Sequence, residues 1–357
     1  MNTLVVRAIR AADLDALYQL TCEAGSGMTT LKPDMDMLGE RLQLACASFA
    51  ETIAANRRDY VFVMEDTGSG RLAGVCAIKS AVGLEAPFYN YRIGTLVHAS
   101  RELGLFTCME TLYLSNDLTG CSELCSLFLH PDYRSGSNGK LLSKSRFLFI
   151  AQFPHLFSQK LIAEMRGFQA PDGSSPFYEG LGRHFFQKDF DYVDGLSGMG
   201  KKSFIADLMP RHPVYVACLA PAAQQVIGQV HASTVPARRL LEQEGFHFEG
   251  YIDIFDAGPV LQTRVSALRA VRESMLLKCD VMQKSAPPPD AGFEPWLLSN
   301  TLFNDFRVIV SAQQTPLLKA DVTPGLSPQE QAMLHCQAGA PLRALALNAQ
   351  NEVKADA

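Results

Sequence analysis

A run of small residues around position 137 has the composition of a phosphate-binding loop. Residues 125–129 are apolar and predict a strand, and the residues that follow the loop, to about 153, predict a helix. Small residues let backbone N–H groups approach a ligand, and a helix start adds unpaired donors and a positive dipole. An ordinary flexible strand-to-helix connection is the alternative interpretation. The candidate ligand contacts are Arg134, Gly136, Ser137, Asn138, Gly139 and Lys140.

The spacing of these small residues differs from that of two common nucleotide-binding loops. It fits neither the P-loop, which ends in Gly-Lys-Ser or Gly-Lys-Thr, nor the three-glycine turn of dinucleotide-binding folds. The segment Arg134-Ser-Gly-Ser-Asn-Gly139 instead resembles the pyrophosphate loop of acyl-coenzyme A dependent N-acyltransferases. That loop reads Gln or Arg, two residues, Gly, one residue, then Gly or Ala. Here Ser137 stands at the first glycine, and Gly136 lies one position early.

A histidine ahead of a predicted helix is the main candidate for proton transfer. His231 ends the segment Gly-Gln-Val-His in a loop before a helix that Pro236 begins. From such a loop an imidazole can reach a cleft, and its ordinary pKa of about 6.5 suits proton transfer near neutral pH. A surface histidine or a turn hydrogen-bonder is the alternative interpretation. His130, at the end of the strand before the phosphate-type loop, is a rival proton carrier or a loop stabiliser.

Charged residues at two predicted strand ends could bind a substrate. Glu164 and Arg166 lie two apart at one strand end, where they could hold a zwitterion or form a structural ion pair. Asp253 or Asp256 could hold a cationic group, and Asp256 before Ala-Gly-Pro is also typical of a turn former. The sequence has no His-Glu-x-x-His motif and no Cys-x-x-Cys pair, so we expect no metal site.

Length and composition describe a globular protein with more than one domain. The chain has 357 residues, 47% of them hydrophobic and 19% charged, and two domains are the usual expectation at this length. A net charge of -5 without a basic stripe argues against nucleic-acid binding. We expect no membrane span, since no run of about 18 apolar residues occurs, and no signal peptide. Nine scattered cysteines indicate a reducing cytoplasm.

Alternating strands and helices must position these residues. The predicted strands cover 4–10, 60–65, 71–79, 125–129 and 160–166, and the predicted helices cover 12–25, 35–56, about 138–153 and 177–188, with an irregular section at 88–107. This order is that of the N-acyltransferase fold, in which two neighbouring strands splay apart. Coenzyme A enters the gap between them and pairs like an added strand.

A second region, from about residue 203, carries a similar helix signature. Strands at 204–208 and 251–255 and helices at 222–227 and 236–245 are predicted there. The helix that leads to Gly245-Phe246 resembles the late helix of acyltransferase domains, which indicates a partial second copy. We therefore expect an α+β, GNAT-like fold that is duplicated and has a small β-rich C-terminal appendage. The expected domains are 1–200 with the coenzyme A loop, 201–285 as the partial copy, and 290–350 as the appendage.

Several ordered blocks resemble the arginine N-succinyltransferase family over roughly residues 3 to 345. They include Ser-Glu-Leu-Cys-Ser-Leu-Phe-Leu (122–129), Gly-Lys-Leu-Leu-Ser-Lys-Ser-Arg-Phe (139–147), Ala-Glu-Met-Arg-Gly (163–167), Gly-Gln-Val-His (228–231) and Tyr-Ile-Asp-Ile-Phe-Asp-Ala-Gly-Pro (251–259). The resemblance implies transfer of succinyl from succinyl-coenzyme A to the α-amine of L-arginine. That reaction is the first step of ammonia-producing arginine degradation.

The same resemblance implies roles for particular residues and partners. His231 is implied to be the catalytic proton carrier, and Leu127 to contact succinyl-coenzyme A, which is a co-substrate rather than a permanently bound cofactor. Family members differ in preference for arginine or ornithine, and some work as paired related subunits, so we expect a homo-oligomer or a paired subunit. Two alternatives stay open: another acyl-coenzyme A dependent N-acyltransferase, or a non-catalytic coenzyme A binding subunit of a paired enzyme.

Overall fold

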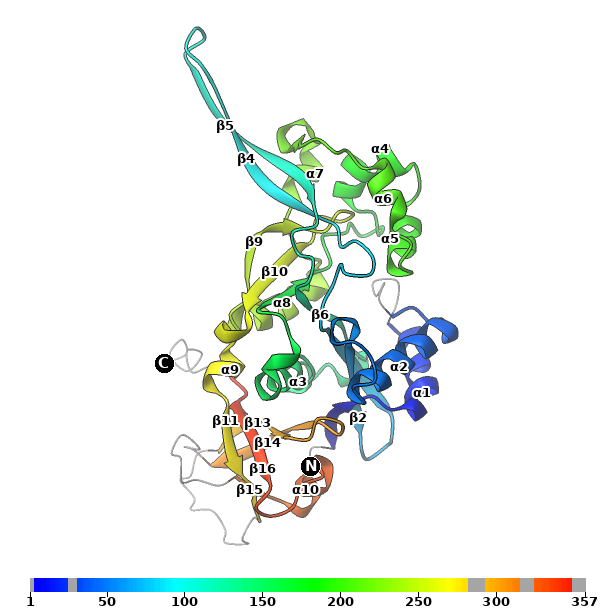
Figure 1. The fold of residues 1–357 in the computed structure, drawn as a ribbon, viewed down its shortest axis with the longest axis vertical. Helices are drawn as coiled ribbons and strands as arrows, with labels where there is room; N and C mark the ends of the chain where they lie inside the picture. Colours follow the sequence, from blue (N-terminus) through cyan, green and yellow to red (C-terminus); the bar gives the residue numbers. More distant parts are fainter. Residues whose placement is uncertain (1–2, 25–30, 282–292, 315–323, 349–357) are drawn as a thin grey trace.

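The structure is a computed structural model that describes residues 3–24, 31–281, 293–314 and 324–348 (Figure 1). Its α-helices are α1 (Leu14–Cys22), α2 (Met35–Phe49), α3 (Asn138–Gln152), α4 (Arg183–Phe186), α5 (Phe190–Gly198), α6 (Ser203–Leu208), α7 (Pro221–Gln225), α8 (Val235–Gln243), α9 (Arg269–Glu273) and α10 (Pro328–Leu334). Its strands are β1 (Leu4–Ala8), β2 (Asp59–Asp66), β3 (Leu72–Lys79), β4 (Asn90–Ser100), β5 (Leu105–Ser115), β6 (Ser122–Leu129), β7 (Lys160–Glu164), β8 (Val214–Tyr215), β9 (His247–Ile252), β10 (Pro259–Arg264), β11 (Met275–Lys278), β12 (Asp280–Val281), β13 (Phe293–Asn300), β14 (Arg307–Gln314), β15 (Gly325–Leu326) and β16 (Pro341–Ala346). Within the described ranges, no helix combines the length and the apolar composition that crossing a membrane requires.

One mixed sheet joins strands from the beginning, middle and end of the chain. Its order in the described residues is β11-β16-β13-β14-β1-β2-β3-β6-β7-β10-β9-β4-β5-β8, and β12 and β15 form a separate pair. In the middle of the sheet β6 and β7 run parallel, whereas their outer neighbours β3 and β10 are antiparallel to them. A parallel pair needs a crossover connection, and α3 lies in the segment that supplies it.

The expected second copy of the acyltransferase unit is not confirmed. The helix interpreted as its late helix, α8, leads into β9 and β10, and β10 pairs along β7. Strands β9 and β10 therefore belong to the same sheet as β1. The C-terminal strands join the same sheet, since β14 pairs with β1. The division into 1–200, 201–285 and 290–350 stays a prediction.

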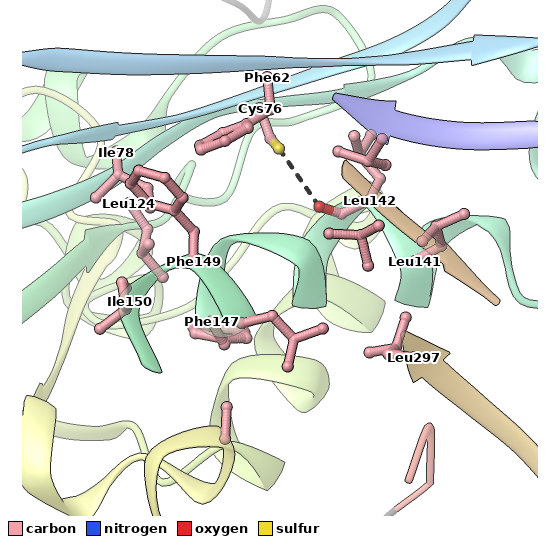
Figure 2. Packing of buried hydrophobic residues seen from close by; sticks show 14 of the residues in the cluster. Phe62, Cys76, Ile78, Leu124, Leu141, Leu142, Phe147, Phe149, Ile150 and Leu297 are labelled. Carbon is pink, nitrogen blue, oxygen red and sulfur yellow. Dashed lines mark hydrogen bonds between the residues drawn. The ribbon is translucent and has the colours of Figure 1, made fainter. Parts of the chain in front are cut away.

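Helix α3 is enclosed because the sheet curves around it. Every residue from 141 to 150 is buried. The helix contacts β3 and β6 from the middle of the sheet and β13, β14 and β16 from its C-terminal part. In Figure 2, Phe147 and Phe149 of α3 lie among core side chains of the sheet, and Cys76 Sγ donates to the carbonyl oxygen of Leu142 at 3.4 Å. The loop ahead of α3 is therefore attached to a helix that the core holds in place.

Buried charges tie α3 to two later segments of the chain. Lys144 Nζ lies 3.2 Å from Glu244 Oε1 and donates to the carbonyl oxygen of Leu347 at 3.0 Å. Arg269 donates to the same Glu244 oxygen from Nε at 3.0 Å and from Nη2 at 2.9 Å, and to the Ala346 carbonyl oxygen at 3.1 Å. A buried charge is tolerated only when it is paired. This network therefore fixes the end of β16 and the turn after α8 against α3.

Strands β4 and β5 form a long hairpin that projects from the body of the molecule (Figure 1). All eleven residues of β4 pair with β5, so the irregular section predicted at 88–107 is wrong. Gly94 weakened the strand pattern there, but the ring of Tyr113 lies over it, where an added Cβ would come within 2.7 Å. An aromatic ring can cover a strand glycine in this way and restore the packing that the glycine lacks.

The strand predicted at 204–208 is also wrong, because α6 covers these residues. Ile205 and Met209 are both buried. A spacing of four places the two side chains on one helical face rather than on opposite faces of a strand. The segment is helical because this arrangement buries one helical face against the neighbouring elements.

Candidate active site

The parallel strands β6 and β7 separate after only two paired positions. Ser122 lies opposite Leu161 and Glu123 opposite Ile162, and no further pair follows among the described residues, although both strands continue. Unpaired backbone groups along diverging strands can pair with an extended ligand. The splayed strands that the order of elements predicts are therefore present.

A bulge interrupts β6 on the strand that borders this gap. Ser126 and Leu127 together lie opposite the single residue Cys76 of β3. Ser126 has a φ of +55°, and its hydroxyl accepts a hydrogen bond from Arg41 Nη1 at 2.8 Å. A bulge takes one residue out of the ladder and redirects the backbone. The backbone at half-buried Leu127 is thus turned out of the regular ladder beside the gap.

The phosphate-type loop follows β6 and leads into α3. Gly136 has a φ of +53°, which glycine adopts without strain, and a Cβ added to Gly136 or Gly139 would meet no atom within 4 Å. The N–H of Leu141 donates to the carbonyl oxygen of Ser137 at 2.8 Å. The N–H groups of Gly139 and Lys140 therefore belong to the first helical turn, which has no carbonyl partner within the helix. Backbone donors and open space coincide at the start of α3.

Side chains of the same loop are engaged within the protein. Arg134 Nε donates to the carbonyl oxygen of Leu129 at 2.9 Å. Asn138 Nδ2 donates to a carbonyl oxygen five residues earlier at 2.9 Å, and Lys140 Nζ donates to Asn348 Oδ1 at 2.7 Å. These bonds hold the shape of the loop, so what it offers directly to a ligand is mainly its backbone.

His231 lies beside the end of β7. Its backbone N–H donates to the carbonyl oxygen of Arg166 at 2.9 Å, next to an isolated bridge between Gly167 and Val230. Its ring Nδ1 lies 2.7 Å from Ser233 Oγ and accepts the Ser233 backbone N–H at 3.2 Å. Partial burial and the charge of Arg166 lower the pKa of His231 below its ordinary 6.5. The ring is therefore neutral at neutral pH, and its Nε2 has no hydrogen-bond partner in the described part of the chain.

The rival histidine, His130, has both ring nitrogens engaged. Nδ1 accepts the backbone N–H of Asp132 at 3.1 Å, and Nε2 contacts the carboxylate of Glu23. The side chain is buried at the start of the short turn that precedes the phosphate-type loop. This arrangement favours the loop-stabilising role for His130.

The structure brings two of the predicted acids, Glu164 and Asp253, to one cavity. The ammonium of Lys202 lines the same cavity, and Glu164 accepts a hydrogen bond from Asn90 Nδ2 at 3.0 Å. Burial and the charge of Asp253 raise the pKa of Glu164 well above its usual range, and burial also raises the pKa of Asp253. Sequence patterns did not indicate Asn90 or Lys202, because each lies far along the chain from both acids.

Two further expectations have different outcomes. Glu164 and Arg166 form no ion pair among the described residues, since the Arg166 guanidinium donates to Gln169. Asp256 is confirmed as a turn former: its carboxylate accepts the N–H groups of Gly258 at 2.8 Å and Gly167 at 2.7 Å. Asp256 therefore links the turn after β9 to the segment that follows β7.

Known proteins resemble this chain over nearly its whole length. The family model described as "Arginine N-succinyltransferase beta subunit" matches residues 4–270. "Arginine N-succinyltransferase" of Shigella sonnei is 45% identical over 349 residues, which cover 98% of this chain and 99% of that protein. "Arginine N-succinyltransferase subunit beta" of Pseudomonas aeruginosa is 47% identical over 347 residues, which cover 97% of this chain and 99% of that protein.

A solved structure has the same fold throughout. It is titled as arginine/ornithine succinyltransferase subunit AI from Pseudomonas aeruginosa, and it superposes with a TM-score of 0.87 at 33% sequence identity. The alignment covers 98% of this chain and 100% of that chain. From the family model, the relatives and this structure together it follows that the chain belongs to the arginine N-succinyltransferase family.

Proposed function

We propose that this protein is an arginine N-succinyltransferase, an acyltransferase that moves succinyl from succinyl-coenzyme A to the α-amine of L-arginine. The observation that carries the proposal is the identity of 45% and 47% to proteins named for this activity, over nearly the whole chain. The gap between β6 and β7 and the open start of α3 support it, because a coenzyme A thioester needs both an extended groove and a phosphate site.

The strands β1-β2-β3-β6-β7-β10-β9 are assigned to an N-acyltransferase (GNAT-like) fold. Pantetheine would lie between β6 and β7, and the pyrophosphate would lie at the start of α3. Succinyl-coenzyme A enters here as a co-substrate that leaves after each turnover. The assigned pyrophosphate contacts are Arg134, Gly136, Ser137, Asn138, Gly139 and Lys140.

Leu127 is assigned to the acyl group. A thioester carbonyl that lies beside the bulge in β6 can accept a backbone N–H there. Such a donor polarises the carbonyl and stabilises the oxyanion that forms when the amine attacks. Positioning of the amine against the thioester supplies much of the remaining acceleration.

His231 is assigned as the proton carrier. In the Nδ1–H tautomer, Nδ1 donates to Ser233 Oγ in place of accepting the Ser233 backbone N–H, and the lone pair of Nε2 is available. The neutral α-amine attacks the thioester carbon, the new C–N bond forms, and Nε2 takes one proton from the amine. When the C–S bond breaks, the imidazolium returns that proton to the coenzyme A thiolate. The products are the succinyl amide and free coenzyme A thiol, without a covalent enzyme intermediate.

The assembly and the cellular location of the enzyme are also part of the proposal. Two relatives carry subunit names, "subunit beta" and "subunit AI", which supports assembly with a second copy or with a related subunit. All nine cysteines are free thiols, which supports a reducing, cytoplasmic location.

Release of free thiol from acyl-coenzyme A tests the proposed activity. Arginine, ornithine and lysine are compared as acceptors, and succinyl- and acetyl-coenzyme A as donors. We expect kcat/KM with succinyl-coenzyme A to exceed that with acetyl-coenzyme A by more than about tenfold, since donors built for a buried carboxylate stay unpaired without it. Equal use of both donors would favour a different N-acyltransferase. Binding of coenzyme A without turnover on any acceptor would favour a non-catalytic subunit.

A further inference from the structure

The cavity beside the end of β7 is lined by more acidic than basic side chains. Its lining contains the carboxyl groups of Glu164 and Asp253 and the ammonium of Lys202. Asp194 of α5 is close enough for repulsion from Asp253 to add to burial in raising the pKa of Asp194 to about 7. A cation that enters this cavity would relieve the repulsion among these acids and stabilise their ionised forms.

Glu164 keeps one carboxylate oxygen available. Glu164 uses Oε1 to accept Asn90 Nδ2, and its Oε2 has no hydrogen-bond partner among the described residues. Asp253 uses Oδ1 to accept the backbone N–H groups of Phe255 at 2.7 Å and Asp256 at 2.8 Å, and its carboxyl also interacts with the carboxyl of Asp256. Glu164 is thus held by one oxygen and presents the other, whereas Asp253 is held by the turn that follows β9.

Asn90 supplies a third acceptor that the protein leaves unsatisfied. The residue is only 1% exposed, and its Oδ1 is a buried oxygen without a hydrogen-bond partner in the described structure. Because Nδ2 of the same planar amide donates to Glu164, Oδ1 lies close to that carboxylate. A buried acceptor without a donor costs stability. Its presence here points to a ligand that supplies N–H groups.

We propose that this cavity binds the cationic side-chain end of the acceptor amino acid, a guanidinium or alkylammonium group, through Glu164, Asp253 and Asn90. The inference rests on the proposed function, because it names the part of that site which recognises the amino acid. A guanidinium carries several N–H donors in one plane, enough to reach all three acceptors. The described residues contain no group of three or more His, Cys, Asp or Glu side chains that could hold a metal ion, which favours an organic cation.

The strand register places the cavity within reach of the acyl site. Continued from the paired positions, the parallel register puts Glu164 of β7 level with Cys125 of β6, two residues before Leu127. Two residues along a regular strand span about 7 Å, and the divergence of β6 from β7 and the bulge in β6 add to the separation of Glu164 from Leu127. His231 is bonded to Arg166, two residues beyond Glu164. An extended arginine side chain bridges such a spacing, so its α-amine would reach the thioester while its guanidinium stays in the cavity.

Equilibrium binding with a neutral isostere of arginine tests this directly. Citrulline has the shape of arginine but a neutral urea group in place of the guanidinium. Calorimetric titration of arginine and of citrulline is carried out on the wild type, on Glu164→Gln and on Asn90→Ala. The matched control is Glu249→Gln, a carboxylate on the exposed part of β9. Thermal melting of each variant confirms that it is folded before titration.

We expect the wild type to bind arginine at least about tenfold more tightly than citrulline. Glu164→Gln should weaken arginine binding about 10- to 100-fold, the usual effect of losing a hydrogen bond to a charged group, and should leave citrulline binding within about threefold. Asn90→Ala should weaken arginine binding in the same direction, and Glu249→Gln should not. Arginine and citrulline bound equally by the wild type, or an unchanged arginine affinity in folded Glu164→Gln, would overturn the assignment.

Kinetics separate this inference from the proposed function. If the wild type releases no thiol with arginine, the succinyltransferase assignment fails, and the titrations still decide whether the cavity selects a cation. If the wild type is active, Glu164→Gln should raise the KM for arginine about 10- to 100-fold and leave the KM for succinyl-coenzyme A within about twofold. Equal increases in both KM values would contradict a role in recognising the amino acid.

Discussion

The backbone N–H of His231 donates to the carbonyl oxygen of Arg166 across 2.9 Å. This bond and the neighbouring bridge from Gly167 to Val230 continue the pairing of β7 beyond its last ladder position at Glu164. The loop that carries the proposed proton carrier is thereby fixed to the strand that carries the proposed cation-binding acid. Since β7 also borders the gap with β6, one strand positions the imidazole, the acid and one side of the acyl-donor groove.

Replacement of His231 by alanine should lower kcat by at least about 10²-fold, because a positioned acid or base contributes about 10²–10⁴-fold. The KM for succinyl-coenzyme A should change little, since proton transfer matters in the transition state more than in donor binding. The wild-type rate should fall at acid pH as the neutral imidazole is protonated. This limb should lie below pH 6.5, because the pKa of His231 is lowered, and it should flatten in the variant.

His247→Ala is the matched control, because His247 is exposed on β9 and pairs with Glu249. It should leave kcat and the acid limb unchanged. A His231→Ala protein that melts at a lower temperature but turns over normally would show that His231 is structural. In that case an ordered water would be the next proton carrier to consider.

Substitution of Gly139 by valine should weaken coenzyme A binding without unfolding the protein. A Cβ at this position meets no protein atom within 4 Å, so the free protein has room for the side chain. The β-branched group would instead stand between the first-turn N–H groups and a bound phosphate. Titration of coenzyme A into the folded variant measures the effect. An unchanged affinity would remove the start of α3 as the phosphate site.

Asp194→Asn should stabilise the ligand-free protein more at high pH than at low pH. Burial and repulsion from Asp253 raise the pKa of Asp194 in the folded state to about 7, above its ordinary value of 3.8. From about pH 4 to 7 the folded state binds more protons than the unfolded state, so stability is lost as pH rises through this window. At pH 8 the full penalty, about 2–4 kcal/mol, should be present and should be relieved by asparagine.

Melting temperatures from pH 5 to 8 measure this effect, with Asp207→Asn on the exposed side of α6 as the control. The difference in melting temperature between Asp194→Asn and the wild type should increase as pH rises. A difference that is constant across this range would show that Asp194 does not titrate there.

Glu244→Gln should lower the free energy of unfolding by about 3–5 kcal/mol, because it leaves buried Lys144 without its counter-ion and Arg269 with the more exposed Glu273 alone. Both cations lie within 3.2 Å of the same Glu244 oxygen. Glu242→Gln, which removes an exposed helical pair with Arg238, should cost about 0.5 kcal/mol or less. Chemical denaturation of both variants gives the comparison, and similar losses in the two would argue against the buried network.

Local sequence patterns were sufficient to predict the features that depend only on residues a few positions apart. The phosphate-type loop, the start of α3 and the turn formed by Asp256 follow from small residues and turn chemistry within a few positions. The hairpin of β4 and β5 was missed, because its strand pattern depends on a partner ring: Tyr113 covers Gly94 only when the strands are paired.

The predicted duplication is not confirmed, and the topology shows why the sequence pattern suggested it. The chain between β7 and α8 holds α4 to α7, so the late helix lies far from the first strands in sequence and resembled the start of a new unit. In the folded protein, α8 leads into β9 and β10, and these two strands belong to the same sheet as the first strands of the chain. The cavity at Glu164 could not be predicted from the sequence for a related reason. The other residues that line this cavity include residues just before β4, residues of α6 and residues of the turn after β9. Only folding of the sheet brings them together.

Incubation with succinyl-coenzyme A and L-arginine, followed by mass analysis and thiol titration, tests the central assignment most directly. The account predicts that N-succinylarginine and free coenzyme A thiol appear in equal amounts, that little thiol is released without the amino acid, and that His231→Ala suppresses both products. Thiol release at the same rate with and without arginine, or no succinylated arginine from folded wild-type protein, would contradict it.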